Sequence, residues 1–338
     1  METIEGTVLA GESFDPVRGR VVLEEGRIEA IEETDTASTD IVVPAFVNAH
    51  THIGDSVAKE GAVGLGLHEA VAPPDSVKHR RLAEADHTDL VAAMERTLRF
   101  MQRTGTAAHL DFRESGVEGA RALREAGEGV TIDPFVFGSG PVSVLDVADG
   151  YGASGANDDD FATERAATRE RGLPFAIHAG EPDATDIDPA LALEPDLLVH
   201  MVHAQQDHLD RVADAEIPVA VCPRANTVLG VGSPPVRDLL DHTTVALGTD
   251  NVMLNPPSML REMAYTVRQF DVSAREVLRM ATTAGAEAVG LDCGVVAPGR
   301  RAALTVFDGD SDNLSGSADP VESIVRRATG LDIDRVVL

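Results

Sequence analysis

The chain has 338 residues, of which 43% are hydrophobic and 25% charged, enough apolar content for one large globular core. It has no apolar run of 18 residues, and its acidic start "METIEGTVLAGESFD" lacks the features of a signal peptide, so we expect a cytoplasmic protein without a membrane span. The formal net charge of −29, spread along the chain, argues against nucleic-acid or anionic-membrane partners.

The two ends of the chain are predicted to be β-rich. Residues 1–41 contain short alternating segments such as "GRVVLEEGRIEAIEE", punctuated by glycine. Residues 293–338 show a similar pattern, with "GVVAPGRRAALTVFDG" and a final "DIDRVVL". We therefore expect these two segments to form one small β-sandwich.

Residues 42–292 alternate between short apolar runs and helical patterns. The runs lie at 42–48, 106–112, 130–138, 173–180, 197–203, 217–223 and 244–250, with a weaker eighth candidate at 149–157. Helical spacing joins Leu90, Met94, Leu98 and Met101, and "SARE" from Ser273 is a capping-box pattern. Repeated strand–helix units of this length favour an α/β fold, a (β/α)8 TIM barrel. No GxGxxG or Walker pattern follows a strand, which weighs against a nucleotide-binding fold.

Polar residues close several of the predicted strands. These are His50, His52, His178, His200 and Asp250. Active sites of such barrels lie at the carboxyl ends of the strands, so the set is expected at one mouth. Imidazoles with a carboxylate are typical ligands of zinc or a similar divalent ion. The two cysteines, Cys222 and Cys293, are far apart and favour neither a disulfide framework nor a cysteine zinc site.

Each residue of this set also has a structural alternative. His50 and His52 could be an accidental pair at a strand end, His178 a hydrogen-bonded core histidine, and Asp250 the N-cap of the next helix. Glu181, three residues after His178, could carry protons beside a metal or be a solvated loop residue. His203 is expected on a loop. The other histidines are taken as surface or supporting residues by default: His68, His79, His87, His109, His208 and His242.

Five ordered motifs carry a resemblance to a known family. They are "PAFVNAHTH", "HAGE", "VHMVH", "CPRANTVLGVG" and "LGTDN", and they span residues 42 to about 265. The chain resembles the amidohydrolase superfamily, in the branch with cytosine deaminase, chlorohydrolases and S-adenosylhomocysteine or guanine deaminases. The terminal segments resemble the small sandwich of these proteins. The low lysine count and acidic composition further suggest a halophilic archaeon as the source.

The resemblance implies roles for the residues at the matching positions. His50, His52, His178 and Asp250 would bind one divalent metal, Zn²⁺ first and Fe²⁺ or Mn²⁺ as alternatives. Asp250 would also accept a proton from the attacking water, Glu181 would shuttle protons, and His200 would hydrogen-bond the hydroxide. Arg224 and Asn226 are expected first to be structural. Because neither Lys59 nor Lys78 ends a middle strand, a lysine-bridged two-metal site is not expected.

The sequence predicts a metal-dependent hydrolase acting on carbon–nitrogen bonds other than peptide bonds. The favoured reaction is deamination of an amino-substituted N-heterocycle of the nucleobase, nucleoside or pterin class, by attack of metal-bound hydroxide. The alternatives are hydrolytic opening of a cyclic amide or amidine and a non-catalytic relative. The loop 53–80 departs from the family pattern, and the candidate pocket residues are Asp55, Ser56, His68, His79, Asp111, Phe112, Arg113 and Arg224. The oligomeric state stays open, with a homodimer as one option.

Overall fold

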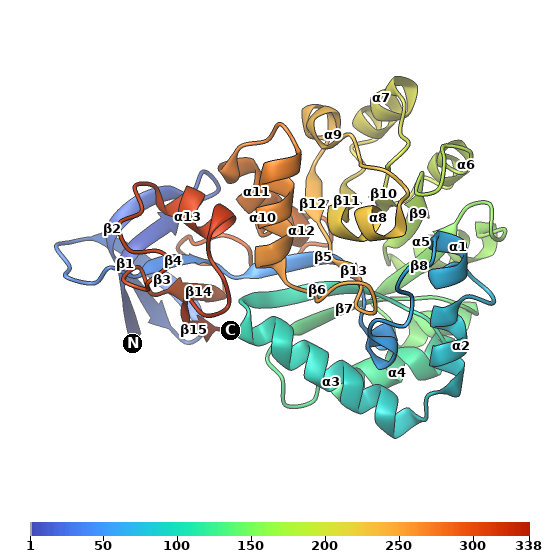
Figure 1. Ribbon diagram of the computed structural model, residues 1–338, viewed down its shortest axis with the longest axis horizontal. Helices are drawn as coiled ribbons and strands as arrows, with labels where there is room; N and C mark the ends of the chain where they lie inside the picture. The colour runs from blue at the N-terminus through green and yellow to red at the C-terminus, as the bar shows by residue number, and fades with distance from the viewer. Residues whose placement is uncertain (1) are drawn as a thin grey trace.

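Both ends of the chain contribute to one six-stranded sheet. The computed structural model describes residues 2–338, and the two termini lie close together beside this sheet (Figure 1). Its strand order is β15-β14-β4-β1-β2-β3. The strands are β1 (Glu2–Ala10), β2 (Asp15–Glu24), β3 (Arg27–Glu33), β4 (Ile41–Pro44), β14 (Leu304–Phe307) and β15 (Ile333–Val337). The pairing of the two ends agrees with the expectation from sequence, while the second layer of a sandwich stays a prediction.

Alternation of apolar and polar residues explains this sheet. In β1 and β2, which pair antiparallel from Glu2–Leu23 to Ala10–Asp15, the buried face carries Ile4, Val8 and Val21. Strand β14 pairs antiparallel with β4, directly ahead of the first strand of the second sheet. The small sheet is thereby attached to the start of the large one.

The second sheet has nine parallel strands in the order β12-β11-β10-β9-β8-β7-β6-β5-β13. They are β5 (Phe46–His52), β6 (Thr106–Arg113), β7 (Asp133–Gly138), β8 (Gly150–Gly155), β9 (Phe175–Ala179), β10 (Leu197–His200), β11 (Val219–Val221), β12 (Val245–Leu247) and β13 (Asp250–Asn251). Each apolar run predicted from the sequence contains a strand. Because only Gly248 and Thr249 separate β12 from β13, the two ends of the sheet lie together. The fold is TIM-barrel-like.

Helices follow the strands, and most of them lie around the large sheet (Figure 1). They are α1 (Leu67–Ala70), α2 (Val77–Glu84), α3 (His87–Arg103), α4 (Gly116–Ala126), α5 (Ala162–Arg171), α6 (Ile187–Ala192), α7 (Gln206–Asp214), α8 (Pro223–Leu229), α9 (Val236–His242), α10 (Met259–Gln269), α11 (Ala274–Met280), α12 (Thr283–Glu287) and α13 (Pro320–Arg326). Short 3₁₀ helices are η1 (Ile53–Ala58) and η2 (Val142–Asp146). No helix in the described chain is long and apolar enough to span a membrane.

Local sequence signals account for several helices. In α3 the predicted apolar face is buried at Met94, Leu98 and Met101. The capping box at Ser273 is confirmed, with Ser273 and Glu276 exchanging hydrogen bonds at the start of α11. Helix α11 ends at Met280, and because Thr282 has non-helical dihedral angles, a separate helix, α12, follows.

Candidate metal centre

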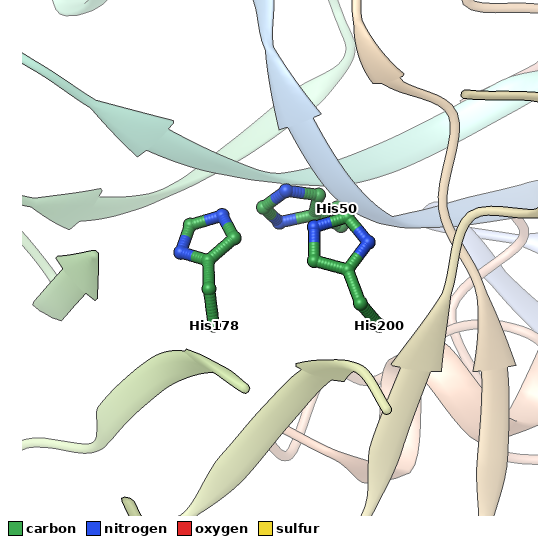
Figure 2. A group of neighbouring side chains, drawn as sticks. All are labelled: His50, His178 and His200. Atoms are coloured by element: carbon green, nitrogen blue, oxygen red, sulfur yellow. The ribbon is translucent and has the colours of Figure 1, made fainter. Parts of the chain in front are cut away.

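Three histidines from three different strands face one another inside the large sheet. His50 comes from β5, His178 from β9 and His200 from the end of β10, and their rings converge (Figure 2). One ring nitrogen from each lies within 4.8 Å of the others. The same limit holds for His50, His52 and Asp250, and for Glu181, His200 and Asp250. The residues predicted at the strand ends are therefore brought together.

His50 lies at the centre of the group and lacks a hydrogen-bond partner. Its ring is fully buried, and neither Nδ1 nor Nε2 has a hydrogen-bond partner among residues 2–338. Asp250 Oδ1 is 3.3 Å from His50 Nε2 and 3.6 Å from His52 Nε2. An unsatisfied buried imidazole is costly unless something else occupies the position beside it. The donor set of imidazole nitrogens and a carboxylate fits a divalent metal ion.

Hydrogen bonds fix the tautomers of His52 and His178. The Nδ1 atom of His52 lies 2.9 Å from the carbonyl oxygen of Phe112, and that of His178 lies 2.8 Å from the carbonyl oxygen of Ala153. A carbonyl oxygen only accepts, so Nδ1 carries the hydrogen and Nε2 presents its lone pair to the centre. Burial lowers the pKa of His52 to about 3 and also lowers that of His178, so both rings are neutral.

His200 has the opposite arrangement. The side-chain amide nitrogen of Asn226 lies 3.2 Å from His200 Nδ1 and donates to it, so Nε2 carries the hydrogen. Burial holds the pKa of His200 well below its usual range, so the ring stays neutral. His200 Nε2 can therefore donate a hydrogen bond into the centre, whereas the Nε2 atoms of His52 and His178 can accept or ligate.

Asp250 owes its position to a break between two strands. The residue adopts a φ of 59°, and Gly248 two residues before it packs against His50, where any Cβ would lie 2.6 Å from the Cβ of His50. The N-cap alternative for Asp250 is wrong, because the next helix, α10, is capped by Ser258. The carboxylate of Asp250 is left to face the histidines.

Glu181 lies at the edge of the same group. Its Oε2 is 3.6 Å from His200 Nε2, and its Oε1 accepts a hydrogen bond of 3.3 Å from Asn226. The side chain is 13% exposed, so the alternative of a solvated loop glutamate is wrong. Burial, with a further contribution from Asp250, raises the pKa of Glu181 well above its usual range. A carboxyl group that holds a proton at this place can donate it.

Comparison with known proteins identifies the family. The model of the amidohydrolase family matches residues 41–176 and 149–338 of the chain. The chain belongs to the amidohydrolase family. A protein of Methanothermobacter thermautotrophicus, provisionally named an aminohydrolase, is 34% identical over 98% of this chain and 96% of its own length.

Two further proteins are similar to this chain. A 5-methylthioadenosine/S-adenosylhomocysteine deaminase of Halobacterium salinarum is 28% identical, over 94% of this chain and 84% of its own. Among solved structures, the zinc complex of atrazine chlorohydrolase from Arthrobacter aurescens superposes with a TM-score of 0.82 at 19% identity, covering 99% of this chain and 93% of that one. The latter similarity supports the amidohydrolase fold.

The predicted pocket residues lie in several different environments. Asp55, Asp111 and Arg113 are fully buried, and Arg113 Nη1 lies 3.6 Å from Asp111. Burial raises the pKa of Asp55 to about 8. Asp111 accepts hydrogen bonds from the Ile53 amide and the Thr51 hydroxyl, which makes it a support for the chain after β5.

Of the remaining pocket candidates, one contacts the centre and the others are paired elsewhere or exposed. The ring of Phe112 packs against His50 with centroids 4.5 Å apart. Arg224 donates to Glu262 and to the carbonyl oxygen of Pro256, so its guanidinium group supports the structure. His68 is exposed, and His79 is half-buried with its ring bonded to Ser76.

Two residues beside the centre were not predicted from the sequence. Glu114 follows β6 directly and contacts His52, and Lys78 in α2 forms an ion pair with Glu114. Burial alone would raise the pKa of Glu114, but Lys78, Arg113 and His52 together hold it well below the usual range. The position of Glu114 directly after a predicted strand is the sequence feature that could have identified it as a site residue. His109 and His208 are buried, so of the two expectations, surface or supporting, the structure leaves the supporting one for both.

Proposed function

We propose that this amidohydrolase is a metal-dependent deaminase of an amino-substituted N-heterocycle of the nucleobase, nucleoside or pterin class. The observation that carries the proposal is the difference in tautomer between His200 and the pair His52 and His178. Two Nε2 lone pairs and a carboxylate suit a metal, and one Nε2–H suits the oxygen of a reacting water. The similarity to a 5-methylthioadenosine/S-adenosylhomocysteine deaminase supports the choice of substrate class.

His50, His52, His178 and Asp250 would hold one divalent ion, for which Zn²⁺ is our first choice. Bound there, the ion would supply Lewis acidity that makes water nucleophilic near neutral pH. The zinc in the similar chlorohydrolase structure supports this choice over Fe²⁺ and Mn²⁺. The buried and unpartnered ring of His50 is the feature of this chain that most requires an ion.

The other residues would move protons and orient the reacting groups. Glu181 would protonate the ring nitrogen of the heterocycle, which makes the adjacent ring carbon more electrophilic. Asp250 would accept a proton from the attacking water. His200 Nε2–H would hydrogen-bond the oxygen that adds to the ring carbon, and Asn226 would hold Glu181 and His200 in register. The proton accepted by Asp250 would pass to the exocyclic amine, which leaves as ammonia. The hydroxyl group left on the ring carbon would return its proton to Glu181 and become the carbonyl oxygen.

The proposal includes the organisation and setting of the chain. We take residues 42–292 as a complete (β/α)8 barrel, because β12 pairs with β11 while β13, two residues later, pairs with β5. Residues 1–41 and 293–338 would form the attached small β-unit. The net charge of −29 supports a protein that works in the cytoplasm of a halophile.

Ammonia release tests the reaction directly. Zinc-loaded protein at molar salt is incubated with aminated purines, pyrimidines, their nucleosides and pterins, and with cyclic amides, and ammonia and products are measured. We expect ammonia from one of the aminated heterocycles and none from protein stripped of metal. Opening of a cyclic amide without ammonia would contradict deamination, and loss of metal dependence would contradict the site.

A further inference from the structure

A buried ionic cluster lies beside His52. Glu114 Oε1 accepts a hydrogen bond of 2.8 Å from His52 Nδ1, and the same oxygen pairs with the ammonium group of Lys78. The other oxygen of Glu114 pairs with Arg113. The side chains of Lys78 and Glu114 are 4% and 17% exposed, so these contacts are made away from bulk water.

The type of cation in this cluster is unusual for the chain. The sequence has 28 lysines and arginines, and only Lys59 and Lys78 are lysines. Lys59 is exposed, whereas Lys78 is buried and directed at Glu114. An ammonium group is a compact point charge, while the planar guanidinium of arginine needs more room. Lys78 therefore places a compact cation directly against the Glu114 carboxylate.

The backbone around Glu114 is held in a defined position. Ser115 has a left-handed φ of 70°, and Gly119 in the first turn of α4 packs directly on the carbonyl group of Glu114, where any Cβ would overlap it. Glu114 itself follows β6 without an intervening residue. The carboxylate is therefore presented to His52 by a rigid strand end.

Because two cations pair with its carboxylate, Glu114 presents little net negative charge to His52. Because Lys78 and Arg113 both pair with it, the negative charge of Glu114 is neutralised locally. Glu114 instead gives His52 a hydrogen-bond acceptor in a fixed place. The second acceptor for His52 Nδ1 is the carbonyl oxygen of Phe112, at 2.9 Å. Two acceptors on Nδ1 fix both the tautomer and the rotation of the ring.

We propose that Glu114 is a positioning residue that holds His52 with Nε2 directed at Asp250, and that Lys78 in turn holds and neutralises Glu114. The inference rests on the proposed metal centre. Since Lys78 lies on α2, it also attaches the segment between β5 and α3 to a metal ligand. That segment is the one whose sequence departs from the family pattern.

Two double variants lack the charges of both Glu114 and Lys78, and they differ in whether residue 114 can still accept a hydrogen bond from His52. Glu114→Gln/Lys78→Met keeps an acceptor at the carboxylate position, and Glu114→Ala/Lys78→Met does not. Both avoid leaving Lys78 buried without a counter-charge. The zinc dissociation constant of each full-length protein is measured at molar salt by competition with a chelator. Asp332→Asn, a buried carboxylate-to-amide change remote from the centre, is the control.

We expect Glu114→Ala/Lys78→Met to bind zinc about 10- to 100-fold more weakly than Glu114→Gln/Lys78→Met, which should stay close to wild type, as should the control. Equal zinc affinities of the two double variants would overturn the positioning role. Wild-type protein that binds no zinc would instead overturn the metal centre itself, so the two failures are distinguishable.

The ion pair is tested by thermal unfolding. Glu114→Gln alone leaves Lys78 buried beside an amide, so we expect a lower midpoint than for Glu114→Gln/Lys78→Met. Adding Lys78→Met should raise the midpoint temperature of unfolding again by several degrees. A further fall of the midpoint in the double variant would contradict the role of Lys78 as the partner of Glu114.

Discussion

Replacement of Glu181 by glutamine tests the proposed proton transfer with little change in shape. The amide has nearly the same volume, and its oxygen can still accept the hydrogen bond from Asn226. It cannot donate an acidic proton to a ring nitrogen. The substitution therefore removes the proton donor and leaves the packing of the centre intact.

The expected loss of reaction rate follows from the position of Glu181 in the structure. Burial and the nearby Asp250 raise the pKa of Glu181 well above its usual range, which favours the protonated form that a general acid needs. Loss of a positioned general acid costs about 10²- to 10⁴-fold in rate, or roughly 3–5 kcal/mol of barrier. The ligand set His50, His52, His178 and Asp250 is untouched, so zinc content should stay at the wild-type value.

The assay is kcat for ammonia release from the best substrate, with zinc content measured on the same preparation. We expect kcat to fall at least 100-fold with unchanged zinc. Turnover within tenfold of wild type would refute the proton-transfer role. Loss of zinc would show instead that Glu181 supports the metal, and would refute the assignment of ligands.

Three further predictions concern other parts of the chain. Asn226→Leu removes the hydrogen bonds to both Glu181 and His200, so we expect kcat to fall at least tenfold with zinc retained; an unchanged kcat would exclude the aligning role. Burial tends to raise the pKa of Asp332, but four accepted hydrogen bonds outweigh burial and lower it. The charged carboxylate therefore stabilises the fold fully above the pKa of about 3.9 in the unfolded chain. This stabilisation is lost as the pH falls through the lower pKa of the folded protein. Asp332→Asn should therefore reduce the free energy of unfolding by about 1–3 kcal/mol at pH 7 and progressively less below pH 4; a loss independent of pH would contradict this. With a net charge of −29, the thermal midpoint should fall as salt is diluted from molar to millimolar concentration, and a midpoint independent of salt would count against the halophile proposal.

The large sheet could be predicted because its strands are buried on both faces. Such strands appear as continuous apolar runs, and polar residues at their ends stand out against them. His50 and His178 were recognisable in this way, as polar residues near the ends of buried strands. The weaker run at 149–157 contains β8, where glycines replace large apolar residues.

Contacts between distant segments could not be predicted in the same way. Lys78 appeared in the sequence as a loop lysine that ends no strand, and only the three-dimensional placement of α2 brings it to Glu114. For Arg224, expected first to be structural and listed also for substrate contact, the partner Glu262 lies 38 residues away and leaves no local signal. Side chains of helices and loops reach their partners through tertiary packing, which leaves no local periodic signal.

The central claim is that one metal ion, held by the four predicted ligands, makes this chain a deaminase. Its most direct test is a titration of metal-stripped protein with zinc at molar salt, with ammonia release from an aminated heterocycle as the readout. We predict that activity is absent without metal, rises with zinc and saturates at one ion per chain. Ammonia release that does not depend on metal, or saturation at two ions, would contradict the account.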